Sequence, residues 1–142
     1  MIEINCDKSK WGPGPWQNEP DRIEFEYNRF PCLMQRNMQL GNWCGYVAVP
    51  PGHPAFEKSY NDIEVNVHGG LTYANHCNGH ICHIPKPGKP DNVWWLGFDL
   101  GHLDDLMPWF KRHGIMNDGV YRDVAYVKAE CKNLAQQLEA MV

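Results

Sequence analysis

The 142-residue sequence lacks long apolar runs, a basic start followed by an apolar stretch, and any cluster of lysines and arginines. A membrane-spanning helix needs about 20 consecutive apolar residues, and a secretion signal needs a basic N-terminus before an apolar segment. Neither a membrane partner nor export is therefore expected, and the cytoplasm is the default compartment. The net charge of -4 disfavours binding to a nucleic-acid polymer, because clustered basic residues neutralise its phosphates.

Motifs with a defined chemistry are also missing from the sequence. There is no His-Glu-x-x-His zinc motif, no phosphate-binding loop, no Gly-x-Ser-x-Gly nucleophile elbow and no dinucleotide-binding glycine pattern. No internal repeat or low-complexity tract divides the chain. The hydrophobic content of 43% and aromatic content of 12% exclude disorder, and the length predicts a single domain over 1–142.

Six cysteines, at positions 6, 32, 44, 77, 82 and 131, make an even number. In a short secreted chain this count would predict three disulfides, but without an export signal we expect reduced thiols. Cys32 and Cys44 stand among apolar residues, and Cys131 falls on the apolar face of a predicted helix. We expect these three thiols to be buried as small hydrophobic side chains.

Hydrophobic patterning predicts four to six strands. Alternation of apolar and polar residues indicates strands with one buried face, and a continuous apolar run is typical of a central strand covered on both faces. The alternating segments include 62–67, and the continuous run is 93–98. The predicted strands cover 23–27, 32–36, 41–49, 62–67, 72–73 and 93–98.

A long amphipathic helix is predicted at the C-terminus, over 120–141, because apolar residues there are spaced alternately by four and three. Asn117 or Asp118 is the expected N-cap. A shorter helix is expected near 103–110. The sequence therefore predicts an α+β fold, with a mixed or antiparallel sheet covered by the C-terminal helix.

Two stretches are expected to be loops. Residues 1–20 are rich in tryptophan, proline and glycine, and residues 75–91 are rich in histidine, cysteine and proline. Neither stretch has the periodicity of a helix or a strand, and prolines remove backbone hydrogen-bond donors. Long loops in a compact domain are often functional.

Two predicted strands end in polar residues that are poor choices for a core. His68 precedes two glycines, and Asp99 precedes His102 and Asp105. If the two strands are neighbours with like ends together, these four side chains converge. Imidazole and carboxylate ligands together suit Zn, Mn or Fe(II). The sequence thus predicts a candidate metal site formed by His68, Asp99, His102 and Asp105.

The same residues also fit structural roles. Asp99 could cap a helix, His102 could pair with Asp105 on the surface, and His68 could bond a buried backbone carbonyl. A catalytic or ligand-binding pocket that holds no metal is a third interpretation.

The segment 76–83 contains five candidate zinc ligands. Its two cysteines are separated by four residues, and no second cysteine pair follows at zinc-finger spacing. We therefore favour a loop over the pocket, in which His80 or His83 serves as acid, base or ligand, since imidazole titrates near neutral pH. A surface loop without chemistry fits equally well.

Further residues are candidate ligand contacts. Gly69 and Gly70 would let a ligand approach the backbone closely. Tyr73 and Trp95 offer rings for stacking on a planar ligand, although core packing is the default role of such rings. Arg122 could clamp an anion.

Three blocks of the sequence carry a resemblance. They are WCGYVAVPPGHP at 43–54, VHGGLTY at 67–73 and WWLGFDLGH at 94–102. Together with the final helix, they resemble a family of uncharacterised proteins from bacteria and their phages. The resemblance implies a single-domain cytoplasmic protein in a phage or mobile-element setting, and it transfers no catalytic role to any position.

The leading hypothesis for function is a small metal-assisted hydrolase acting on a nucleotide or another phosphorylated small molecule. His68, Asp99 and either His80 or His83 would be its catalytic groups. The first alternative is a non-enzymatic protein that binds and sequesters a small ligand such as a nucleotide signal. The second alternative is an interaction or scaffold protein. A homodimer is compatible with all three.

Overall fold

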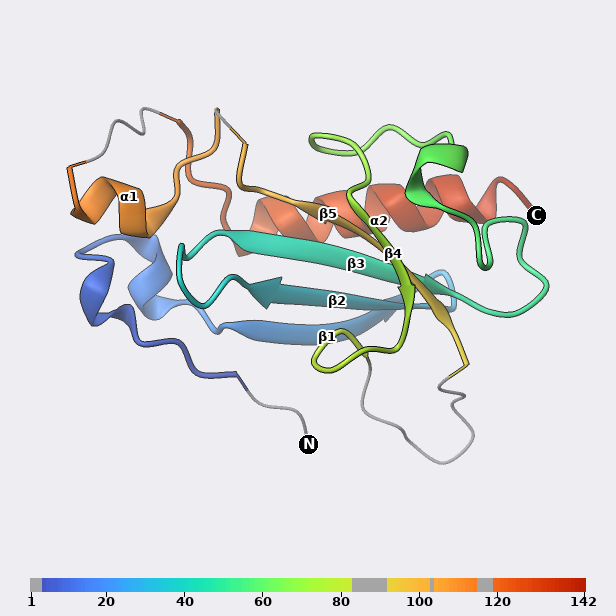
Figure 1. Cartoon of the computed structure of the whole chain (residues 1–142), viewed down its shortest axis with the longest axis horizontal. Coiled ribbons are helices and arrows are strands. Elements are labelled where there is room, and N and C mark those ends of the chain that lie inside the picture. Colours follow the sequence, from blue (N-terminus) through green and yellow to red (C-terminus); the bar gives the residue numbers. More distant parts are fainter. Residues whose placement is uncertain (1–3, 83–91, 103, 115–118) are drawn as a thin grey trace.

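The fold is α+β, with one antiparallel sheet of five strands and a C-terminal helix, as the patterning predicts (Figure 1). The computed structural model describes residues 4–82, 92–102, 104–114 and 119–142. The strands are β1 (Arg22–Tyr27), β2 (Phe30–Arg36), β3 (Trp43–Val49), β4 (Tyr73–His76) and β5 (Trp94–Asp99). The helices are α1 (Pro108–Arg112) and α2 (Val124–Glu139), and three short 3-10 turns are Lys8–Lys10, Pro15–Asn18 and Tyr60–Asp62.

The sheet has the strand order β1-β2-β3-β5-β4. Every neighbouring pair is antiparallel. β5 lies between β3 and β4, which places the continuous apolar run in the interior of the sheet, as expected for a strand covered on both faces. β4 is the edge strand beside it and pairs only through Tyr73–His76.

Both faces of the sheet are buried. One face packs against α2, which runs along it in Figure 1. The apolar positions of α2 that are fully buried there are Val127, Cys131, Leu134, Ala135 and Leu138. The other face carries a separate apolar cluster, which we call the second cluster, made of Leu33, Tyr46, Ala48, Val93 and Trp95.

The predicted strand at 62–67 is wrong. The segment alternates in burial, with Val67 buried and Asn66 exposed, but within the described part of the chain it pairs with no strand. Its backbone bonds side chains of α2 instead: Asn66 N–H donates to Gln137 Oε1 (2.8 Å) and Asn133 Nδ2 donates to Asn66 O (3.0 Å). Alternation of apolar and polar residues indicates an extended backbone with one buried face. It does not tell whether a strand or side chains bond that backbone.

The C-terminal helix begins later than the predicted residue 120. Asp123 is its N-cap, because its side chain accepts a hydrogen bond from Tyr126 N–H (2.9 Å). Val120 forms an isolated bridge with Asp105 and is not helical. The predicted caps, Asn117 and Asp118, lie outside the described residues.

The guanidinium of Arg36 joins the N-terminal segment to the rest of the fold. It is fully buried and contacts Asp21 (2.9 Å), Glu19 (3.2 Å) and the hydroxyl of Tyr121 (2.9 Å). It also lies over the ring of Trp43, 4.3 Å from the ring centroid. A buried charge is tolerated only when its partners are in place, so Arg36 fixes the N-terminal segment and the residues that precede α2 in one arrangement.

Replacing Arg36 with methionine should lower the free energy of unfolding by about 3–5 kcal/mol, because it leaves two carboxylates without their buried cation. Urea denaturation followed by circular dichroism measures this loss. Arg29→Met, at an exposed turn position, is the matched control and should change stability by about 0.5 kcal/mol or less. Equal losses in the two variants would contradict the assigned role of Arg36.

Candidate functional site

The structure brings together His68, His102 and Asp105, which we call the His/Asp cluster. His68 Nε2 lies 2.9 Å from Asp105 Oδ2, and His102 Nδ1 lies 3.4 Å from the same oxygen. One nitrogen of each imidazole and one carboxylate oxygen all lie within 4.8 Å of one another. Residues 37 positions apart in the sequence therefore share one site.

Local backbone geometry allows this approach. Gly69 and Gly70 have φ values of +68° and +81°, in the left-handed region that glycine adopts most easily. They form a turn in which Gly70 N–H donates to Val67 O (2.9 Å). A Cβ atom on Gly69 would lie only 2.2 Å from Cε1 of His102. Gly69 is thus required for the two segments to meet.

Asp105 lies at the centre of the cluster, with only 1% of its side chain exposed. Burial alone would raise the pKa of its carboxyl. Hydrogen bonds from His68 Nε2 and from the His102 N–H (3.0 Å) to Oδ2, and from Arg122 Nε to Oδ1 (3.2 Å), outweigh burial and hold the pKa below its usual value. Asp105 is therefore an ionised carboxylate at neutral pH.

An ionised carboxylate can only accept hydrogen bonds. The proton between His68 and Asp105 therefore belongs to His68 Nε2. In the neutral imidazole, Nδ1 is then an acceptor, and the hydroxyl of Tyr126 donates to it (2.8 Å). The arrangement fixes both the tautomer and the orientation of His68.

One side of α2, together with Arg122 just before its N-cap, supports the cluster. Tyr126 and Glu130 are spaced by four in the helix and so face the same way. Glu130 Oε2 accepts a hydrogen bond from the backbone N–H of His68 (3.1 Å), and the Arg122 guanidinium lies 4.8 Å from the centroid of the Tyr126 ring. Sequence reasoning missed Tyr126 and Glu130, although their spacing by four in the predicted C-terminal helix was the available signal.

Asp99 lies beside the cluster. Its Oδ1 is 3.6 Å from His102 Nδ1, and 36% of its side chain is exposed. It accepts hydrogen bonds from the Thr72 hydroxyl (3.2 Å) and from Gly101 N–H (3.0 Å). Three of the four predicted ligands thus form the compact group, and the fourth stands at its exposed edge.

Several predicted site residues lie elsewhere. Trp95 is fully buried in the second cluster, where Tyr73 packs against Tyr46 with a ring-centroid distance of 5.5 Å. His80 follows the end of β4 that is farther from His68, and its backbone oxygen accepts a hydrogen bond from Arg22. His83 lies outside the described residues. Of the predicted ligand contacts, Gly69, Gly70 and Arg122 remain near the cluster.

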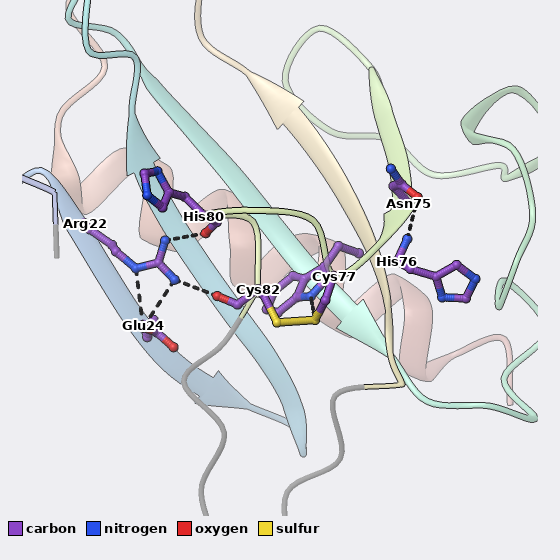
Figure 2. Close-up of a disulfide and its surroundings, with 8 residues drawn as sticks. Arg22, Glu24, Asn75, His76, Cys77, His80 and Cys82 are labelled. Carbon is purple, nitrogen blue, oxygen red and sulfur yellow. Dashed lines mark hydrogen bonds and ion pairs between the residues drawn. A yellow bond between two sulfur atoms is a disulfide. The ribbon is translucent and has the colours of Figure 1, made fainter. Parts of the chain in front are cut away.

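A disulfide joins Cys77 and Cys82 (Figure 2). The expectation that all six cysteines are reduced is therefore wrong for this pair. Since both sulfurs are bonded to each other, neither is available in this state as a thiolate ligand for zinc. The predicted burial holds for Cys32 and Cys131, whereas Cys44 is only partly buried.

Comparison with known proteins identifies no relative: no family model, no curated protein and no solved structure matches the chain. In the described ranges, neither α1 nor α2 has the length and apolar character that crossing a bilayer requires. The inferences about function therefore rest on the geometry of the His/Asp cluster.

Asp105→Asn should destabilise the protein by about 3 kcal/mol at neutral pH, because it removes a buried charge that has cationic and polar partners. A carboxyl whose pKa is lowered on folding stabilises the native state above its unfolded pKa of about 3.9, and this stabilisation is lost as pH falls through the folded pKa. The variant should thus lose stability less steeply than the wild type as pH falls below about 5.

Urea denaturation at a series of pH values measures both effects. Asp104→Asn removes the same charge at the exposed neighbouring position and is the matched control. If Asp105→Asn and the wild type have parallel pH profiles, the carboxyl of Asp105 does not have a lowered pKa.

Proposed function

We propose that this protein is a small metal-assisted hydrolase that acts on a nucleotide or another phosphorylated small molecule. The observation that carries the proposal is the His/Asp cluster, in which ligand atoms of His68, His102 and Asp105 lie within 4.8 Å of one another. Two imidazoles and one carboxylate suit Zn, Mn or Fe(II), whereas Mg and Ca favour oxygen ligands alone.

The spacing of the ligand atoms supports a shared ion. Ligands about 2.1 Å from one metal ion lie about 3.0 Å apart in adjacent octahedral positions and about 3.4 Å apart in tetrahedral ones. Asp105 Oδ2 lies 2.9 Å from His68 Nε2 and 3.4 Å from His102 Nδ1. Two ligands about 2.1 Å from one ion lie at most about 4.2 Å apart, so an ion could bind once the two imidazole nitrogens lie within that distance. The three ligand atoms of the cluster lie within 4.8 Å of one another.

The partners of the cluster also support metal binding. Arg122 Nε donates to Asp105 Oδ1, while Oδ2 faces both imidazoles and would exchange its contact with the His68 Nε2 proton for the ion. On metal binding, His68 would switch tautomer: Nε2 would release its proton to solvent, Nδ1 would take one up from solvent, and Nδ1–H would then donate to the Tyr126 hydroxyl. A hydrogen bond from the second ring nitrogen is the usual way in which a protein orients a histidine ligand.

A bound metal ion lowers the pKa of its water ligand to about 7 and so supplies a nucleophile at neutral pH. Asp99, at the exposed edge of the cluster, would accept a hydrogen bond from that water and orient it. Arg122 has 24% of its side chain exposed, and within the described residues its Nη atoms have no hydrogen-bond partner. These atoms would bind phosphate oxygens, which a guanidinium contacts in pairs.

A non-enzymatic ligand-binding protein is the second candidate. It is favoured by the hydrogen bonds that Asp105 already receives from His68, His102 and Arg122, since these hold the cluster together without an added ion. Such a protein would release its ligand unchanged on denaturation, whereas a hydrolase would release product.

Titration of the metal-free protein with Co²⁺ or Zn²⁺ should show one ion bound per chain, because the cluster provides one set of ligands. His68→Ala and His102→Ala should each abolish binding at micromolar metal. His113→Ala, which removes an exposed histidine outside the cluster, should bind as the wild type does. Isothermal calorimetry and the visible spectrum of Co²⁺ are the measurements. Equal binding by all three variants would place the metal elsewhere.

Metal-loaded protein should release phosphate from at least one member of a panel of nucleotides and sugar phosphates. For that substrate, Asp99→Asn should lower kcat at least tenfold, because the attacking water loses its acceptor, and Arg122→Met should mainly raise KM. Asp104→Asn is the control for charge. A ligand that raises Tm but is recovered intact would favour the binding protein instead.

A further inference from the structure

Among the cysteines that the structure describes, the pair in one surface loop differs from the others in its bonding. The free thiols are Cys6, Cys32, Cys44 and Cys131. Burial raises the pKa of each of them, to about 11 for Cys6, to about 12 for Cys32 and Cys44, and higher still for Cys131. Since the thiolate is the reactive form, these four are inert at neutral pH. The other two cysteines, Cys77 and Cys82, are partly exposed and joined to each other.

The residues 77–82, which we call the disulfide loop, also form a turn through the backbone. Asn78 N–H donates to Ile81 O (3.1 Å), and Ile81 N–H donates to Asn78 O (3.0 Å). Gly79 supplies the left-handed conformation in this turn, with φ of +56°. The turn keeps the two sulfur atoms close together by contacts that do not involve the S–S bond, so a reduced pair would be well placed to close again.

The disulfide loop covers part of the second cluster. Cys77 and Ile81 pack against this apolar face, and the indole N–H of Trp95 donates to Cys77 Sγ (3.4 Å). Across the sheet, Arg22 of β1 donates to the backbone oxygens of His80 and of Cys82 (2.6 Å for Cys82) (Figure 2). The disulfide is therefore in direct contact with a buried tryptophan, so a change in its redox state alters the surroundings of that side chain.

We propose that Cys77–Cys82 is a reversible thiol–disulfide exchange site whose co-reactant is a small monothiol of the glutathione type. The thiolate of the co-reactant attacks one sulfur, the S–S bond breaks, and a mixed disulfide forms. A second thiolate then attacks the mixed disulfide and releases the oxidised co-reactant. The protein gains two electrons and two protons as two thiols, and the co-reactant loses the same number.

Reduction of the disulfide changes the part of the disulfide loop that covers Trp95. The disulfide loop keeps its turn but loses its covalent closure, and the sulfur that accepts the Trp95 N–H becomes part of a free thiol. The cover over the second cluster then opens more readily. This site is independent of the His/Asp cluster, which lies at the other end of β4.

The test uses the whole folded protein in buffers with defined ratios of reduced to oxidised glutathione. Alkylation and mass spectrometry count the thiols and assign them, and tryptophan fluorescence reports on Trp95. As the ratio rises, we expect Cys77 and Cys82 to become alkylated together. Fluorescence should rise in step because a disulfide quenches a neighbouring indole, and oxidised glutathione should reverse both changes.

Three variants make the test specific. Cys6→Ser removes a free thiol outside the disulfide loop and should respond like the wild type. The double variant Cys77→Ser/Cys82→Ser should show no response. Trp95→Phe should keep the change in thiol alkylation but lose the change in fluorescence. This variant therefore separates reduction of the disulfide from the fluorescence signal of Trp95.

The proposal is overturned if the disulfide resists excess reduced glutathione until urea unfolds the chain, because it is then a purely structural cross-link. It is also overturned if the purified protein under oxidised glutathione has both thiols free. Reduction without any change in Trp95 fluorescence would overturn the inferred coupling to the second cluster.

Discussion

A single buried carboxylate sets the geometry of the candidate site. Asp105 receives hydrogen bonds from His68, from His102 and from Arg122, which belong to three segments of the chain. In a poorly solvated environment these bonds reinforce one another, and loss of one partner leaves a costly charge. One negative charge that water does not reach therefore positions three segments: the turn at Gly69, the residues after β5 and the residues just before α2.

The sequence predicted most of the strands and the long helix because their patterns depend only on which face is buried. The meeting of His68 with Asp105 was also predicted, but on the wrong premise. His68 does not end a strand: it ends an extended segment whose backbone bonds side chains of α2. Hydropathy cannot distinguish these partners from a neighbouring strand, and it gives no information on long-range contacts such as that between His68 and Tyr126.

The cysteines show a different limit of sequence reasoning. The expectation of free thiols rested on an expected compartment, which concerns the whole chain. The bond between Cys77 and Cys82 instead accompanies a local turn that has Gly79 at its tip. Buried thiols such as Cys131 were predictable because burial follows the helical pattern, whereas pairing depends on the conformation of a few loop residues.

Helix α2 serves the interior and the candidate site at once. Leu134 and Leu138 pack in the core, while Tyr126 and Glu130 hold the ring and the backbone of His68. A rigid helix transmits a shift at one end of its apolar face to its other residues. Substitutions in the core under α2 would therefore also disturb the His/Asp cluster, and the cluster cannot diverge in evolution independently of the interior behind it.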